Sequence, residues 1–231
     1  MRFDKFVSSS LNISRNKASN LIKEGKVFLD GRILDEVSAE ISSGDITLGE
    51  TVHVSRGALK LKPFLDKLNL NLQDLNALDV GSSTGGFVEV LLYSGVKSVT
   101  ALDIGTMQLD GSLRYDKRVI VRENTDIRDF KSENKFDIIT CDVSFISLKN
   151  IMQSLKYLSN GIIIVLFKPQ FEVGLHTKRN KKGVVTDEKA IIIAKANFES
   201  FCLNLGLKLI LTKECEITGK NGNKEYFYAF K

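Results

Sequence analysis

One stretch of the chain decides its fold: Asn76-Ala-Leu-Asp-Val-Gly-Ser-Ser-Thr-Gly-Gly-Phe87. A short apolar run ends at Asp79, a turn of small residues follows, and an apolar helical pattern begins at Phe87. This order predicts a strand, a turn without bulky side chains, and a helix. Glycine lets the backbone pass close to a ligand, and a helix N-terminus offers free N–H groups. The sequence therefore predicts a ligand site at the carboxyl end of this strand.

The glycines of this turn do not form a dinucleotide fingerprint, because Gly81, Gly85 and Gly86 do not fit G-x-G-x-x-G. The carboxylate of Asp79 would repel a pyrophosphate but suits a cation or an amino group. Asp103 ends the next apolar run, 22 residues after Gly81, where an acid that binds ribose is expected. The combination indicates S-adenosylmethionine, whose tail is cationic. The alternative is a generic strand–turn–helix of any α/β protein.

Composition describes an ordinary soluble protein of 231 residues, with 43% hydrophobic and 26% charged residues. A net charge of +5 permits a polyanionic partner without requiring one. Three cysteines without C-x-x-C spacing favour a reducing, cytoplasmic setting. The N-terminus does not resemble a signal peptide, and the longest apolar run, 162–167, is far shorter than the roughly 20 residues that span a bilayer. No membrane partner is expected.

Residues 1–57 are predicted to form a small separate α+β module. Ser14 is a plausible N-cap for its second helix, and Gly25 ends that helix. A hairpin with an Asp30-Gly31 turn follows. The basic residues Arg15, Lys17 and Lys23 surround the second helix and could meet phosphates, although they could equally form a solvated face.

A resemblance favours RNA binding for this module. Its residues run Ser14-Arg-x-x-Ala-x-x-Leu-Ile-x-x-Gly-x-Val-x-x-Asp-Gly31. This order resembles the RNA-binding module named after the fourth protein of the small ribosomal subunit. The resemblance implies that the basic helix and the adjoining turn bind structured RNA.

Residues 58–231 alternate between apolar strand patterns and helical patterns, which predicts a mainly parallel, Rossmann-like sheet wrapped by helices. The last strand follows a glycine-containing turn and could enter antiparallel. The predicted strands are 77–80, 98–102, 119–122, 136–141, 161–167, 208–212 and 225–230.

Four charged residues stand where such a sheet places chemistry. Asp142 and Lys168 each follow a strand, Lys60 precedes the first strand, and Glu225 begins the last one. Partial desolvation at the end of an apolar strand would favour the uncharged amine of Lys168 and suit it to proton transfer. Singly, each residue could be structural. The two histidines stand alone, so we expect no metal site.

Together these positions resemble the TlyA (haemolysin A) family, which joins the same module to a domain similar to FtsJ, a ribosomal RNA 2′-O-methyltransferase. The matching motifs are Ser55-Arg-Gly-Ala-Leu-Lys-Leu61, Asp79–Phe87, Cys141-Asp-Val-Ser-Phe-Ile-Ser147, Lys168-Pro-Gln-Phe-Glu172 and Asn223-Lys-Glu-Tyr226. The resemblance implies a catalytic set of Lys60, Asp142, Lys168 and Glu225, with Lys62 as an alternative to Lys60. The chain is similar to the shorter members of the family, which implies methylation of a ribose, that of cytidine, in large-subunit ribosomal RNA.

The same reading assigns the remaining contacts. Asp79 should meet the methionine amino group and Asp103 the ribose hydroxyls, while Asp126 should lie near the adenine. The predicted cofactor contacts are Asp79, Gly81, Ser82, Ser83, Thr84, Gly85, Gly86, Phe87, Asp103, Ile104, Asp126 and Asp142. The predicted RNA contacts are Arg15, Lys17, Lys23, Lys178, Arg179, Lys181 and Lys182, the last four in a loop that could instead be simply solvated.

Three functional classes fit this sequence to different degrees. The first is an S-adenosylmethionine-dependent methyltransferase acting on ribosomal RNA or a ribosomal subunit. The second is a pore-forming haemolysin, for which the sequence shows no apolar span and no strongly amphipathic helix. The third is an RNA-binding protein without catalysis, which the intact turn and the four charged residues disfavour.

Overall fold

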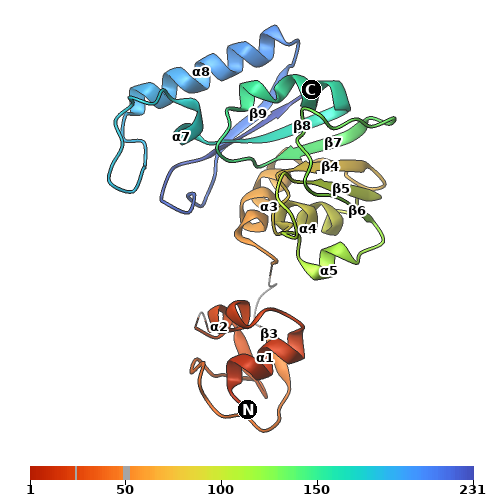
Figure 1. The fold of residues 1–231 in the computed structure, drawn as a ribbon, viewed down its shortest axis with the longest axis vertical. Coiled ribbons are helices and arrows are strands. Elements are labelled where there is room, and N and C mark those ends of the chain that lie inside the picture. The colour runs from red at the N-terminus through yellow and green to blue at the C-terminus, as the bar shows by residue number, and fades with distance from the viewer. Residues whose placement is uncertain (24, 49–52) are drawn as a thin grey trace. The chain divides into compact units, whose positions relative to one another are not determined.

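The computed structural model describes residues 1–23, 25–48 and 53–231, which belong to two compact units, Met1–Val52 and His53–Lys231 (Figure 1). The second unit begins five residues before the expected start at residue 58. His53 Nδ1 lies 2.9 Å from Glu89 Oε2, and the Val54 N–H donates to the same carboxylate at 3.1 Å. Residues 53–57 are therefore packed with the second unit.

The N-terminal unit is a small α+β fold, as predicted. Its elements are α1 (Phe3–Leu11), α2 (Arg15–Lys23), β1 (Val27–Leu29), β2 (Arg32–Ile33) and β3 (Ile46–Leu48). The Lys17 N–H donates to Ser14 Oγ at 3.3 Å, so Ser14 caps α2 as expected. Phe3 and Val7 of α1 and Ile22 of α2 are fully buried, and they form the centre of a single small core.

The predicted hairpin is present and is one part of a three-stranded sheet in the order β2-β1-β3. Asp30 and Gly31 have φ angles of 49° and 76°, as a two-residue hairpin turn with left-handed backbone requires. The third strand, β3, pairs antiparallel with β1 and was not predicted from the sequence.

The second unit contains a seven-stranded sheet in the order β6-β5-β4-β7-β8-β10-β9. Within this sheet β10 alone runs in the direction opposite to the other strands, as expected for the last strand. The strands of the sheet are β4 (Asn76–Val80), β5 (Ser98–Leu102), β6 (Val119–Arg122), β7 (Phe136–Cys141), β8 (Ser159–Phe167), β9 (Leu209–Glu214) and β10 (Tyr226–Phe230). Its helices are α3 (Arg56–Leu68), α4 (Gly86–Tyr93), α5 (Gly111–Arg114), α6 (Met152–Leu158), α7 (Pro169–Glu172), α8 (Glu188–Asn204) and the 3₁₀ turn Leu148–Asn150.

Helices cover both faces of this sheet (Figure 1). On one face, Leu61 and Phe64 of α3 pack with Leu91 of α4, and the Phe64 ring stacks on Phe227 at 4.7 Å. Strands with apolar residues on both sides need such double cover.

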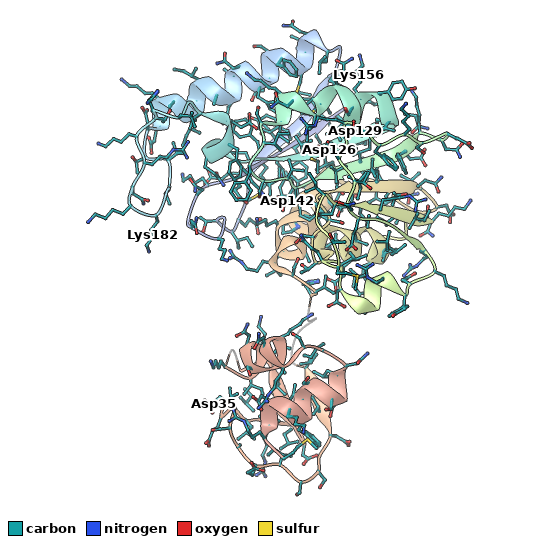
Figure 2. All side chains as sticks on the ribbon, in the orientation of Figure 1. Asp35, Asp126, Asp129, Asp142, Lys156 and Lys182 are labelled. Atoms are coloured by element: carbon teal, nitrogen blue, oxygen red, sulfur yellow. The ribbon has the colours of Figure 1, made fainter. Side chains whose placement is uncertain are left out.

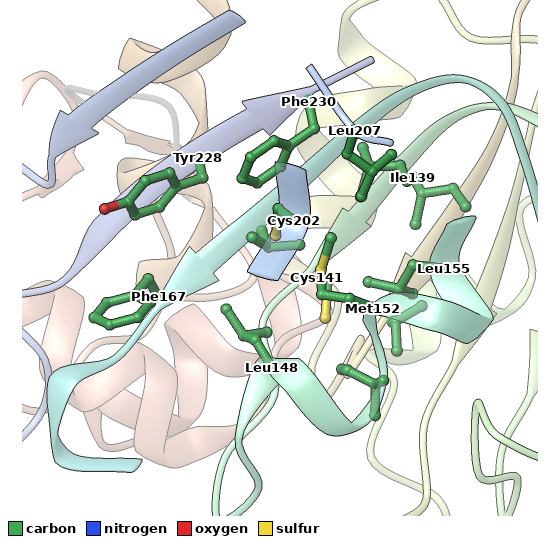
Figure 3. Packing of buried hydrophobic residues seen from close by; sticks show 14 of the residues in the cluster. Ile139, Cys141, Leu148, Met152, Leu155, Phe167, Cys202, Leu207, Tyr228 and Phe230 are labelled. Atoms are coloured by element: carbon green, nitrogen blue, oxygen red, sulfur yellow. The ribbon is translucent and has the colours of Figure 1, made fainter. Parts of the chain in front are cut away.

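The opposite face carries the larger core (Figure 3). Phe198 and Cys202 of α8 and Leu155 of α6 pack there against Phe167 and Tyr228 of the sheet. With both faces filled, the carboxyl edge of the parallel strands is the place left for a ligand. No helix in the described ranges is long and apolar enough to span a bilayer.

Candidate active site

The strand register brings the predicted residues to one edge of the sheet. Asp79 on β4 lies opposite Thr140 on β7, so that Asp142 follows within reach of the turn after β4. Phe167 of β8 pairs with Tyr226 of β10, which places Lys168 and Glu225 at the same end of two adjacent strands.

Three cavities adjoin along this edge. The first, of about 500 Å³, is lined by Asp103, Ile104, Asp126 and Asp142, two of which are labelled in Figure 2. The second, of about 250 Å³, lies between the turn after β4 and the start of α3, and the third, of about 420 Å³, lies beyond Lys168.

Shared lining residues connect these cavities. The first and second cavities share Gly81, Ser83, Asp142 and Ser144, and the second and third share Lys60, Ser144 and Lys168. The arrangement is one continuous trough, with the charged residues where its compartments meet. Such a trough can hold two reactants with their reacting atoms side by side.

Asp79 supplies an unpaired carboxylate oxygen to the second cavity. Its Oδ1 accepts a hydrogen bond from Thr140 Oγ1 at 2.6 Å, whereas Oδ2 has no hydrogen-bond partner among the described residues. Burial raises the pKa of Asp79 to about 7, and the charge of Asp142 adds to that rise. A buried carboxylate oxygen without a partner fits an ammonium group.

Asp103 is fixed in the wall of the first cavity. Its Oδ2 accepts the Ser83 N–H at 2.8 Å, and its Oδ1 accepts the Gly105 N–H at 2.7 Å. Asp126 lines the same cavity, and its Oδ1 accepts the N–H of Arg128 at 2.9 Å. The Arg128 guanidinium holds the pKa of Asp126 below its usual value.

The small residues of the turn surround the second cavity, with one exception. The lining residues from the turn are Gly81, Ser82, Ser83, Thr84, Gly86 and Phe87. Gly85 lines none of the three cavities; its φ is 97°, and Leu109 and Leu113 leave no room for a Cβ at this position. A Cβ on Gly81 would lie 2.5 Å from the carbonyl oxygen of Asp142. The backbone that follows β7 therefore leaves no room for any residue larger than glycine at this position.

The four charged residues form two ion pairs. Lys168 Nζ lies 2.5 Å from Asp142 Oδ1 and donates to Ser144 Oγ at 3.1 Å. Lys60 Nζ donates to Glu225 Oε2 at 2.8 Å. The side chains of Lys168, Lys60 and Glu225 are only 10%, 11% and 3% exposed, so water screens these charges weakly.

The geometry distinguishes the two candidate lysines of α3. Lys60 lines the second and third cavities, whereas Lys62 pairs with Asp66 one turn along the exposed side of the helix. Lys60 is therefore the lysine that reaches the trough.

Two residues of the trough were not selected from the sequence. Ser144 lines all three cavities, and Phe145 lines the first and the third. Phe145 has a φ of 65°, its side chain is 91% exposed, and its ring lies 5.2 Å from that of Phe171. Both lie within the motif that follows β7, but only their position in the fold connects them with chemistry. An exposed aromatic residue with left-handed backbone is unusual and indicates a functional constraint.

The predicted RNA contacts differ in their surroundings. Arg179 lines the third cavity and donates to the carbonyl oxygen of Gln170 at 3.1 Å, while Lys178, Lys181 and Lys182 are exposed. In the other unit, Arg15 is engaged by the buried carboxylate of Asp4, with Nε 3.0 Å from Oδ2. Arg179 is thus half-buried, whereas Arg15 stays exposed like the three loop lysines although it is ion-paired. Among the described residues, no group of three or more His, Cys, Asp or Glu side chains is arranged to hold a metal ion.

Known protein families match the two structural units of the chain separately. Residues 53–231 match the FtsJ-like methyltransferase family, and residues 1–46 match the S4 domain.

Relatives that match most or all of the chain are named as ribosomal RNA methyltransferases or as haemolysins. The chain is 48% identical to the 23S rRNA (cytidine-2′-O)-methyltransferase TlyA of Campylobacter jejuni, with 100% of this chain and 99% of the relative covered. It is 36% identical to the 16S/23S rRNA (cytidine-2′-O)-methyltransferase TlyA of Mycobacterium tuberculosis, over 96% of this chain and 86% of the relative. A solved haemolysin-named protein from Streptococcus thermophilus is 32% identical, with a TM-score of 0.76, over 100% of this chain and 87% of that one. The chain therefore belongs to the TlyA family of FtsJ-like methyltransferases, in which an S4 domain precedes the methyltransferase domain.

Proposed function

We propose that this protein transfers a methyl group from S-adenosylmethionine to the 2′-hydroxyl of a cytidine in large-subunit ribosomal RNA. The observation that carries the proposal is the position of Lys168 and Asp142 where the three cavities meet. The activity after which the Campylobacter jejuni relative is named, 23S rRNA (cytidine-2′-O)-methylation, supports the choice of nucleotide and subunit.

The residues of the trough fit the cofactor. The unpaired Oδ2 of Asp79 would accept the ammonium of the methionine end, and the fixed carboxylate of Asp103 would accept the ribose hydroxyls. Asp126 and Ile104 would border the adenine in the first cavity. When bound, the cofactor supplies a methyl group on a sulfonium centre and a neutral thioether as the leaving group.

Lys168 is our candidate for the general base. In the uncharged form of Lys168, Nζ would accept the proton of a ribose hydroxyl in the third cavity as the hydroxyl oxygen bonds to the methyl carbon, while the electron pair of the broken carbon–sulfur bond stays on sulfur. Asp142 would stabilise the ammonium that forms, because its carboxylate is 2.5 Å away. Lys60, held by Glu225, would favour the negative charge that develops on the attacking oxygen.

The proposal is tested by methyl transfer to ribosomal RNA from a strain lacking this protein. We expect the purified protein to add one 2′-O-methyl group to a cytidine of the large-subunit RNA, located by mass spectrometry of RNA fragments. Calorimetry with S-adenosylmethionine provides the accompanying binding measurement. Methylation of a base, or no cofactor binding at all, would contradict the assignment.

Phe145 provides a prediction about the target nucleotide. Its exposed ring borders the third cavity, where it could stack on the target base, an interaction worth about 1–3 kcal/mol. Phe145→Ala should lower kcat/KM for RNA about tenfold or more by this estimate, and Phe145→Tyr should retain most activity. The rate is measured at saturating cofactor, and the cofactor Kd is measured in parallel. Leu175→Ala, at an equally exposed apolar residue of the neighbouring loop, is the matched control.

The S4 domain provides a second prediction. Lys17 and Lys23 lie on α2, and each phosphate that they neutralise should release counterions. Changing both to glutamine should weaken RNA binding and reduce the slope of log affinity against log salt by about 1 to 2. Affinity for S-adenosylmethionine should be unchanged. Arg15 is unsuitable for this experiment because it shares the buried Asp4 carboxylate with Arg2, so its loss would also weaken that buried ion pair. An unaltered salt slope would show that α2 does not contact phosphates.

A further inference from the structure

The loop between β5 and α5, residues 104–110, contributes to two parts of the trough. Ile104 and Gln108 line the first cavity. Leu109 packs against Gly85 of the turn after β4, and the Asp110 N–H donates to the carbonyl oxygen of Thr84 at 3.2 Å. The position of this loop therefore sets the width of the first cavity and supports the turn beside the second.

A single carboxylate outside the trough organises this loop. Glu123 follows β6, its side chain is 10% exposed, and it lines none of the three cavities. It binds the loop through three consecutive backbone N–H groups. Oε2 accepts the N–H of Met107 at 2.8 Å, and Oε1 accepts those of Gln108 at 2.9 Å and Leu109 at 3.2 Å.

The backbone of the loop is shaped for this anion. Met107 has a φ of 54°, and a left-handed residue in such a turn lets successive N–H groups converge on one point. Arg114 of α5 completes the site, with Nη2 2.6 Å from Glu123 Oε1. The Arg114 guanidinium and the three N–H groups together lower the pKa of Glu123 to about 2. The carboxylate is consequently ionised under all ordinary assay conditions.

We propose that Glu123 is a positioning residue for the nucleoside end of S-adenosylmethionine, acting through residues 104–110. The inference rests on the proposed function, because it requires that the first cavity hold the adenosine group. Without this carboxylate the three N–H groups lose their common acceptor, and Gln108 in the wall of the first cavity and Leu109 beside Gly85 lose their fixed positions. The reacting groups at Lys168 lie elsewhere and keep theirs.

Glu123→Gln is the decisive variant, because an amide has the shape of the carboxyl group but offers only one acceptor oxygen. At least one of the three N–H groups then faces an NH₂ group. We expect the Kd for S-adenosylmethionine to rise about tenfold or more, with kcat at saturating cofactor unchanged. The affinity for 5′-methylthioadenosine, which lacks the amino-acid end, should fall by the same factor. Glu133→Gln, which removes the same charge from an exposed residue, should leave both affinities at the wild-type value.

Two further measurements keep the inference separate from folding and from the proposed function. Arg114→Gln removes the strongest partner of Glu123 but leaves the N–H contacts, so it should weaken cofactor binding less than Glu123→Gln. Thermal unfolding of each variant reports any loss of the fold, and if Glu123→Gln does not fold, a wild-type cofactor Kd in Arg114→Gln overturns the inference. Wild-type affinity in a folded Glu123→Gln protein also overturns it. Failure of the wild-type protein to bind the cofactor would instead contradict the proposed function.

Discussion

Lys168→Ala is expected to lower the rate of single-turnover methyl transfer by about two to four powers of ten, the range usual for the loss of a general base. Lys168 is the one described lysine in contact with Asp142, and it borders the cavity proposed for the target ribose. Affinities for cofactor and RNA should change little, because other residues provide most of their contacts. The measurement is transfer of labelled methyl to a ribosomal RNA fragment at saturating cofactor.

Lys168→Arg distinguishes a base from a fixed positive charge. A guanidinium remains protonated and cannot accept the hydroxyl proton, so this variant should be almost as slow as Lys168→Ala. A near-normal rate would show that positive charge alone is needed. Asp142→Ala should be similarly slow, and the double variant should be far from additive, as expected for residues that act as one unit.

Lys60 and Lys62 form a matched pair of controls on the same helix. Lys60→Ala removes the partner of the buried Glu225 carboxylate and should slow methyl transfer, whereas Lys62→Ala removes only an exposed ion pair and should not. Equal rates of methyl transfer in the two variants would show that Lys60 does not contribute to catalysis.

Much of the fold could be predicted from local patterns. The inner strands β4, β7, β8 and β10 are mostly buried apolar residues, because helices cover both faces of the sheet there, and such runs are visible without tertiary information. The short strand β3 is different, since Ile46–Leu48 is only partly buried and its pairing with β1 closes a long loop. The second unit begins at His53 rather than at residue 58, and local patterns do not reveal this, because the contact of His53 with Glu89 joins residues that are far apart in the chain.

The site divides in the same way. The position of Asp79, Asp142 and Lys168 at one edge of the sheet could be predicted, because parallel strands end at one edge and a charged residue after an apolar run lies there. The position of Glu123 could not be predicted in this way, since its contacts are with three N–H groups of a loop that lies 14 to 16 residues earlier in the chain. Nor could the engagement of Arg15 by Asp4, because a basic helix in the sequence does not reveal which of its charges are already paired.

Asp79 should make cofactor binding depend on pH, and this is the second large effect that we expect. In the free protein burial raises the pKa of Asp79 to about 7, so the carboxyl group holds its proton below that pH. The ammonium of S-adenosylmethionine needs the ionised form. Affinity should therefore increase by up to about tenfold per pH unit as the pH rises toward 7, and a proton should be released on binding. Above about 8 the affinity should fall again, because an α-amino group loses its own proton there.

The same titration of Asp79 should change the stability of the free protein in the opposite direction to the cofactor affinity. Unfolded, the Asp79 carboxyl has its ordinary pKa of 3.8, so between about 4 and 7 the folded state binds the extra proton and the free protein loses stability as the pH rises. A thermal unfolding series across this range, with and without cofactor, measures both effects in one sample. The cofactor should stabilise the protein most near pH 7 to 8.

Two variants test whether Asp79 is the group responsible. Asp79→Asn should weaken cofactor binding at pH 7.5 and remove the rise in affinity between pH 5 and 7. Thr140→Val removes the hydroxyl that donates to Oδ1 and stabilises the carboxylate, so it should move the rise in affinity to higher pH. Calorimetry in buffers of different ionisation enthalpy counts the protons released on binding. An affinity that does not change from pH 5 to 7 in the wild-type protein would show that Asp79 does not bind the ammonium, since no buried carboxyl with a pKa near 7 could then be part of that contact.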